Sequence, residues 1–385
     1  MGQSYDLLPS SNRPTMRLLF AMMCICCTLW FTTIWAAHSD KAKLKEVYSQ
    51  YKSLFHQGKY VSSLPYAEQA LELSKAISGA KSKTTVTLSH NYGINLLRAG
   101  KAKEASDVLS DTVDLCKEVY GSQAPELIGL YVDLSDALRT ADYKSKWYKS
   151  HELALSIAKK VYGKNSADYG MLLVDLGHIE LIKQAQNGEN RIRKGYKILK
   201  GLDIPHPDMC RAEFVMGKLE LGHRRYMAAR THLESSLLAM NEERVGPDFE
   251  QTARAFLVEA LENLGESELA TEHLLVIGRK QAEAGMSNLK PLFLKKPNFP
   301  ENVIRQQTGT NIDIKKINEG TVVLEFDVDE KGFTRNIRVK MLDGPKDFIE
   351  PAIEAVKQYR FAPRFVDGKP VMVRDATQTF HFLIF

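Results

Sequence analysis

The chain has 385 residues, and at roughly 100–200 residues per domain this length predicts two or three domains. Hydrophobic residues make up 44% and charged residues 26% of it, as in ordinary folded proteins. The net charge is +5, and because acidic and basic residues are mixed throughout, no basic stripe indicates a nucleic-acid partner.

An uncharged apolar run, Leu18–Ala37, lies near the N-terminus. As a helix with a rise of ~1.5 Å per residue it is long enough for a hydrocarbon core of ~30 Å, so we expect one transmembrane anchor at residues 18–37. A cleaved signal peptide is the alternative. It fits less well, because the run is long and cleavage after Ala37 would leave the bulky Trp35 at the third position back.

Five cysteines are present, and none has the spacing of a zinc site or a redox pair. Three of them, Cys24, Cys26 and Cys27, lie in the apolar run. Cys116 and Cys210 lie in separate helical segments, where we expect small buried side chains; a disulfide between them stays open if the compartment is oxidising.

Residues 43–286 have a helical pattern that repeats. Val119-Tyr120-Gly121 recurs forty-two residues later as Val161-Tyr162-Gly163, and Gly58-Lys59 recurs at the same spacing as Gly100-Lys101. Such a period indicates stacked helix pairs. With small residues at the expected helix crossings, the segment resembles longer-period tetratricopeptide repeats, and we expect six helix pairs that begin near residues 43, 84, 126, 168, 208 and 249.

Such a repeat array commonly binds a peptide or protein in a groove, and a pure spacer is the alternative. The pattern does not identify groove residues. A proline-rich stretch follows at residues 287–299, where Pro291 and Pro297 predict an extended linker to the last domain, residues 300–385.

The C-terminal domain is expected to contain a strand, a turn, a strand, a helix and a final strand. Apolar residues alternate through Thr321–Asp329, and a glycine turn follows. The second strand is expected to point Ile337, Val339 and Met341 inward. Its helix should begin at an Asp347 N-cap and bury Ile349, Ala352, Ile353 and Val356. The final strand, Val371–Phe385, is the expected edge of the sheet.

These residues resemble the C-terminal domain of the TonB family. The resemblance rests on Gly320-Thr-Val-Val-Leu-Glu-Phe-Asp-Val-Asp-Glu-Lys-Gly332, on Tyr359-Arg-Phe-Ala-Pro363 and on Asp367-Gly-Lys-Pro370. The expected fold class is therefore mainly α: a tetratricopeptide-like α-solenoid plus a small α+β (β-β-α-β) TonB-like domain, with one N-terminal transmembrane helix. In the motif, Tyr359 and Phe361 should pack under the sheet, and Arg360 should stack on them or pair with Glu350 or Glu354.

The resemblance implies a periplasmic domain that binds a segment of an outer-membrane TonB-dependent receptor by strand addition and so supports receptor-mediated uptake. It also implies a cytoplasmic N-terminus at residues 1–17, a single-pass inner-membrane location and contact with inner-membrane motor proteins. The predicted partner-binding residues lie on the final strand: Val371, Val373, Arg374, Asp375, Thr377, Gln378, Thr379 and His381.

No catalytic motif, metal-binding motif or cofactor-binding loop occurs in the sequence, so we predict that the protein is not an enzyme and needs no cofactor. The anchor segment has polar threonines and cysteines but no acidic, basic or histidine side chain, which argues against proton-coupled energisation. The alternative function is a non-energised periplasmic scaffold for protein–protein interaction.

Overall fold

The computed structural model describes residues 40–143, 146–183, 187–202, 209–240, 248–286, 291–294 and 318–384. The predicted anchor, residues 18–37, and the N-terminal residues 1–17 lie outside these ranges. Within them, no helix combines the length and the apolar character that a membrane crossing requires. The chain divides into two compact units, Met1–Tyr169 and Gly170–Phe385.

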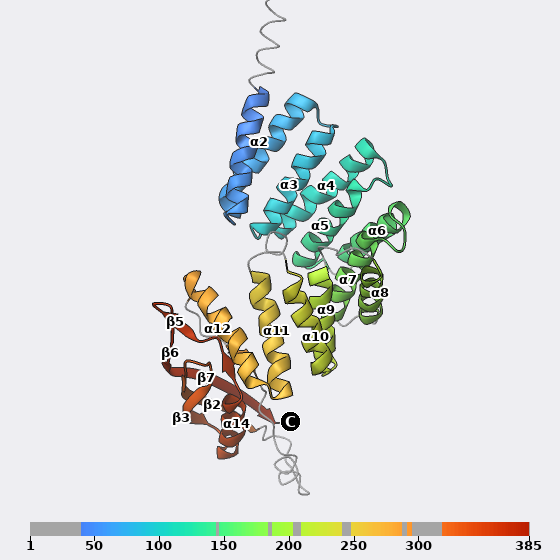
Figure 1. Ribbon diagram of the computed structural model, residues 1–385. Helices are drawn as coiled ribbons and strands as arrows, with labels where there is room; N and C mark the ends of the chain where they lie inside the picture. The colour runs from blue at the N-terminus through green and yellow to red at the C-terminus, as the bar shows by residue number, and fades with distance from the viewer. Residues whose placement is uncertain are drawn as a thin grey trace, which may run out of the picture. The chain divides into compact units, whose positions relative to one another are not determined.

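In the first unit, helices pair with a regular period (Figure 1). Residues 40–56 are helical and precede the following helices: α2 (Tyr60–Ser78), α3 (Lys83–Arg98), α4 (Ala102–Tyr120), α5 (Glu126–Thr140) and α6 (Lys146–Val161). The turns inside successive pairs contain Gly58, Gly100 and Asp142, forty-two residues apart and all with positive φ. A left-handed residue lets the chain reverse sharply after each first helix, which explains the sequence period.

The second unit continues the repeats. Its helices are α7 (Ala167–Ile182, which begins just before the boundary), α8 (Gly188–Lys200), α9 (Met209–Gly222), α10 (Tyr226–Leu238), α11 (Asp248–Leu264) and α12 (Ser267–Glu283). Close packing needs small residues at the crossings, because a Cβ atom on Gly217 of α9 would lie 2.6 Å from Leu233 Cγ of α10. The helix pairs of the described residues begin where the sequence pattern predicts, as in a tetratricopeptide-like solenoid.

A β-rich domain follows in the same unit. Its main sheet has three antiparallel strands in the order β3-β2-β7, where β2 is Asn318–Val328, β3 is Thr334–Asp343 and β7 is Val373–Ile384. A one-turn η1 (Lys346–Phe348) leads into α14 (Ile349–Lys357), which covers one face of the sheet. The predicted β-β-α-β order is therefore present.

Four short strands add to this order. β1 (Pro291–Phe293) pairs with β4 (Arg360–Phe361), and β5 (Arg364–Val366) forms a hairpin with β6 (Lys369–Val371). The predicted linker thus contains a paired strand. The predicted final strand begins two residues late: Val371 belongs to β6 and pairs with Arg364.

Two expectations for this domain are wrong. Met341 is 50% exposed, because the pairing of β3 with β2 skips Lys340 and this bulge moves Met341 to the open face, opposite Val323. Val339 is opposite the buried Leu324 but is still 40% exposed on this edge strand. Leu342 packs against the core in its place. The helix also lacks a side-chain N-cap at Asp347, which lies in η1, and the fully buried Phe348 fills that position instead.

Cys116 and Cys210 are both buried and free. They lie in different units, and the disulfide that the sequence left open is not formed. Burial raises the pKa of the Cys116 thiol to about 11, as expected for a small apolar side chain rather than a reactive one.

Candidate protein-interaction site

Strand β7 is an edge of the main sheet. Of the described strands, only β2 pairs with it, and the pairing runs without a register shift from Ala376 to Ile384. In an antiparallel strand, alternate residues direct their N–H and C=O groups to opposite sides. Those directed away from β2 form a regular row that an extended segment could pair with.

The predicted partner-binding residues divide along β7. Thr377, Thr379 and His381 are exposed on the open face of the sheet, whereas Phe380 and Phe382 between and beyond them are buried against α14. His381 Nδ1 lies 3.1 Å from Thr321 Oγ1 of β2. The side chains on the open face are therefore polar and accessible to a visiting strand.

Of the remaining predicted residues, Gln378 lies between Thr377 and Thr379, and the others lie at the beginning of β7 or before it. Val373 packs against the core and Gln378 is half-buried, whereas Arg374 and Asp375 are exposed. Val371 is the one predicted residue outside β7, and its pairing with Arg364 removes it from the regular edge.

A bulge separates these two parts of β7. Asp375 has a φ of 56°, and the register with β2 shifts beside it. The Asp327 carboxylate of β2 accepts hydrogen bonds from the Asp375 backbone N–H (3.2 Å) and from Asn336 Nδ2 of β3 (2.8 Å). These bonds lower the pKa of Asp327, Asn336 contributing most.

Charged side chains cross the open face from β3 to β7. Glu325 on β2 bonds to Lys340 Nζ (2.7 Å) and Arg338 Nε (2.8 Å), and Arg338 also pairs with Asp375. Lys340 and then Arg338 lower the pKa of Glu325. The row holds all three strands in register at the surface, although exposed ion pairs contribute little stability individually.

The opposite edge, β3, is irregular. Its pairing with β2 shifts twice, near Asn336 and at Lys340, and Asn336 has a φ of 49°. Arg335, Arg338 and Lys340 along it are exposed cations. Bulges and lysine or arginine side chains are features that hinder the pairing of an edge strand, so β7 is the more suitable edge for strand addition.

The β-rich domain also contacts the last helix pair, through a residue of its signature motif. Arg360 is 1% exposed and pairs with Glu262 of α11. Its Nη2 donates to Thr271 Oγ1 of α12 (2.7 Å), and its guanidinium lies 3.7 Å from the Phe333 ring centroid. The expected pairing with Glu350 or Glu354 was wrong, whereas Tyr359 and Phe361 are buried as predicted.

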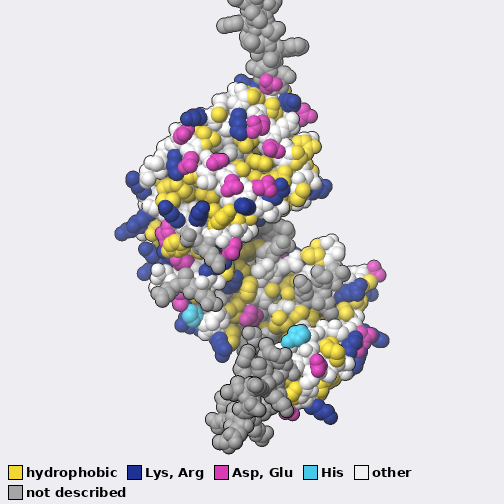
Figure 2. Space-filling view, turned by 180° about the vertical axis from the view of Figure 1, so that it is seen from behind, with side chains coloured by type: hydrophobic (Ala, Val, Ile, Leu, Met, Phe, Trp, Pro, Cys, Tyr) yellow, Lys and Arg dark blue, Asp and Glu magenta, His cyan; other side chains and the backbone are white. Residues whose placement is uncertain are grey.

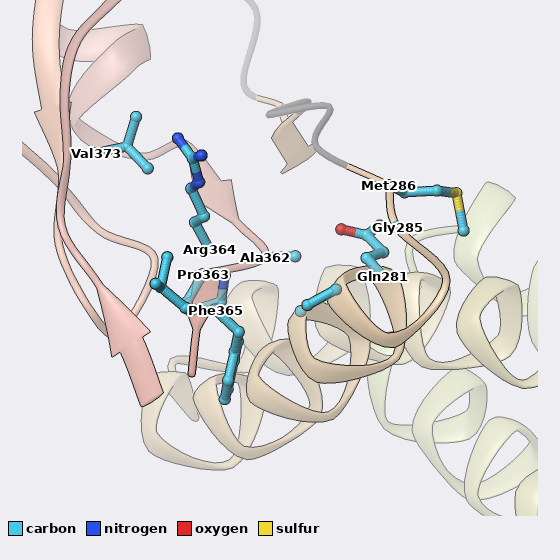
Figure 3. A pocket seen from close by; sticks show the side chains of 11 residues that line it. Gln281, Gly285, Met286, Ala362, Pro363, Arg364, Phe365 and Val373 are labelled. Carbon is cyan, nitrogen blue, oxygen red and sulfur yellow. The ribbon is translucent and has the colours of Figure 1, made fainter. Parts of the chain in front are cut away.

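A cavity of about 270 Å³ lies beside this contact (Figure 3). It is bounded by Gln281 and Met286 of the α12 region, by Pro363 and Phe365 of the β-rich domain, and by Val373 at the beginning of β7. The sequence pattern did not indicate it, because its two walls are about eighty residues apart in the chain.

The first helices of successive repeats are joined by polar side chains at the repeat spacing. In the first unit, Asn91 Nδ2 donates to Tyr48 Oη (3.3 Å), and His90 Nε2 lies 2.6 Å from Asp133 Oδ2. In the second unit, Lys218 Nζ lies 3.0 Å from His178 Nε2, and burial lowers the pKa of Lys218. These contacts join the first helices of neighbouring repeats within each unit.

A pocket opens between the helix at residues 40–56 and α3, at the start of the first unit. It has a volume of about 460 Å³, and its lining combines the lysines Lys41, Lys45 and Lys83 with the apolar Leu44 and Leu88. Elsewhere acidic and basic side chains are interspersed over the visible surface (Figure 2). In the ranges that the structure describes, no cluster of three or more His, Cys, Asp or Glu residues has the arrangement of a metal site.

Known protein-family models match both the C-terminal domain and part of the helical repeats. Residues 311–384 match the family model of the Gram-negative bacterial TonB protein C-terminal domain, and residues 52–118 match a tetratricopeptide repeat. The chain therefore combines a TonB-type C-terminal domain with a tetratricopeptide repeat array, and both resemblances are confirmed. The two families support a role in protein–protein interaction.

The curated relatives share only part of the chain. The Clustered mitochondria protein homolog of Aspergillus fumigatus is 24% identical over 163 residues, which is 42% of this chain and 12% of that protein. Its homologue in Aspergillus clavatus is 26% identical over 167 residues, or 42% and 13% of the two chains. The chain thus spans about an eighth of the length of these relatives.

Solved structures with similar helical repeats include BtubC from P. vanneervenii, with a TM-score of 0.46 and 16% identity over 66% of this chain and 98% of that one. The apo form of RapI has a TM-score of 0.46 and 15% identity over 65% and 67% of the two chains. Likenesses this distant say nothing about a ligand or partner.

Proposed function

We propose that this protein is a TonB-like periplasmic tether or energy transducer that binds a short extended segment of an outer-membrane receptor at the free edge of β7. In this proposal the segment 18–37 anchors the chain in the inner membrane, and the repeats occupy part of the periplasm. The protein supports receptor-mediated uptake by holding the receptor segment at a fixed place.

The observation that carries the proposal is the difference between the two edges of the sheet. β7 pairs with β2 in unbroken register from Ala376 to Ile384, while β3 is bulged near Asn336 and at Lys340. Strand addition draws its affinity from main-chain hydrogen bonds and therefore needs a regular row of them. Thr377, Thr379 and His381 would then contact the alternate side chains of the bound segment.

Site-specific photo-crosslinking in intact cells tests the proposal. A photoreactive residue at Thr377 or Thr379 should trap an outer-membrane receptor, and the same residue at Lys340 on β3 should not. Both positions are exposed on the same sheet, so the comparison isolates the edge. Equal trapping at Lys340, or no trapping at either β7 position, would refute the assignment of β7 as the binding edge.

A second function, a scaffold that receives no energy, is favoured by the composition of the segment 18–37. That segment contains no acidic, basic or histidine side chain to contact a proton-driven motor complex. Replacing Leu18–Ala37 with an unrelated anchor separates the two functions. Uptake should fail for a transducer, whereas receptor crosslinking and uptake should both persist for a scaffold.

A further inference from the structure

The packing of Arg360 points to a role for the last helix pair that goes beyond the proposed function. We propose that α11 and α12 are an integral part of the TonB-type domain, and that Arg360 is the positioning residue that holds them to it. The edge of β7 then moves together with the last repeat. This inference holds whether or not β7 binds a receptor.

The first argument is charge. The Arg360 side chain is 2% exposed and the Glu262 side chain 10%. A buried cation is costly unless it is paired and hydrogen-bonded. Among the described residues, the carboxylate that hydrogen-bonds to Arg360 is Glu262 of α11, and Asp329 of the β-rich domain adds a weaker electrostatic attraction. The compensating carboxylate comes from α11, and a further acceptor, Thr271 Oγ1, comes from α12.

The second argument is shape. Gly278 of α12 lies so close to the β-rich domain that an added Cβ atom would be 2.2 Å from the Pro363 carbonyl oxygen. One residue further, the Arg279 guanidinium lies 5.8 Å from the Phe365 ring centroid. The surface of α12 therefore fits the segment that directly follows Arg360.

The third argument is that β1 belongs to both parts. Its backbone pairs with β4, and Phe293 is opposite Arg360 in that pairing. Its side chains Leu292 and Phe293 pack against the apolar core to which α9, α10, α11 and α12 contribute. β1 thus pairs through its backbone with the β-rich domain and packs through its side chains on the helices. Separating the helices from the β-rich domain would disrupt it.

Hydrogen–deuterium exchange on the full chain tests the proposal. Arg360→Met keeps an apolar side chain of similar length but leaves Glu262 buried without its cation. We expect backbone exchange in β1, β4 and the facing turns of α11 and α12 to become faster by on the order of 100-fold, with β2 and β7 still protected. The control is Lys369→Met, which removes an exposed cation of β6 and should change nothing.

Changes on the helix side make the test specific. Glu262→Met alone should deprotect β1 and β4, and the double variant Arg360→Met/Glu262→Met should restore their protection, because an apolar pair can replace a buried ion pair. The proposal is overturned if Arg360→Met leaves β1 and β4 protected or deprotects β2 and β7 equally. It is also overturned if Glu262→Met has no effect on the strands, or if the double variant is not rescued.

Discussion

The carboxylate of Asp327 on β2 accepts a hydrogen bond from the backbone N–H of Asp375 on β7, at 3.2 Å. This bond lies at the one register shift between the two strands, where Asp375 takes up a left-handed conformation. The bond stabilises the bulge at Asp375, and from Ala376 onward β7 pairs with β2 in unbroken register. The regular edge of β7 therefore begins directly after the bulge that this bond stabilises.

Protonation of Asp327 should weaken the sheet. Because its pKa is lowered in the folded state from an unfolded value of about 3.9, its contribution to stability is present above about pH 4 and is lost as the pH falls through the folded pKa. Asp327→Asn should therefore lower the free energy of unfolding at pH 7 and reduce its dependence on pH in the acid range, as measured by urea unfolding. Glu330→Gln, which removes a charge from the adjacent turn, is the control.

A methyl group on Gly278 should disturb the contact between α12 and the β-rich domain. The Cβ of Gly278→Ala would meet the Pro363 carbonyl oxygen at 2.2 Å, and overpacking of this kind costs about 1–3 kcal/mol. Urea unfolding should show the loss. Gly222→Ala, at the end of α9, has open space around its Cβ and should be neutral or slightly stabilising. Equal stabilities for the two variants would contradict the observed packing.

Acid should also loosen the last helix pair through His273. Burial, and secondarily the nearby Arg254, lower the pKa of His273 from 6.5 to about 4. The unfolded chain therefore binds more protons between these values, and stability should decrease as the pH falls from 6.5 to 4. His273→Gln should reduce this slope in denaturant unfolding, whereas His56→Gln, a change at an exposed site in the first unit, should leave it as in the wild type.

Phe348 should be essential to the C-terminal core. It is fully buried, and its ring stacks on Phe382 of β7 with centroids 4.7 Å apart. Phe348→Ala should cost about 3–5 kcal/mol, as for other large-to-small core changes. Phe348→Leu keeps more of the volume and should cost clearly less. Near-ultraviolet circular dichroism and urea unfolding measure both, and a cost for the alanine variant no larger than for leucine would show that the ring fills no essential space.

Periodic features of the chain were predictable from the sequence. The recurrence of Gly58 at Gly100 reflects a left-handed turn that each helix pair needs, so the spacing follows from the backbone. The alternation through Thr321–Asp329 likewise predicted β2, since Val322, Leu324, Phe326 and Val328 all point into the core.

Features that depend on a single extra residue or on distant partners were not predictable. One bulged residue, Lys340, reverses the faces of Met341 and Leu342, and a period of two cannot indicate where it occurs. Glu262 is ninety-eight residues away from Arg360, on a helix whose pattern resembles the other repeats. Asp327 looks like any outward-facing strand residue until the conformation of Asp375 is known.

The two register shifts of β3 restrict where a further strand can pair with this sheet. A sheet that accepts new strands on both sides can grow without end, as in a fibril. Here β3 is bulged near Asn336 and at Lys340, so among the described strands β7 offers the regular edge. The β3 edges of two copies are therefore unsuited to pair with one another, and assembly by strand pairing is restricted to contacts through β7.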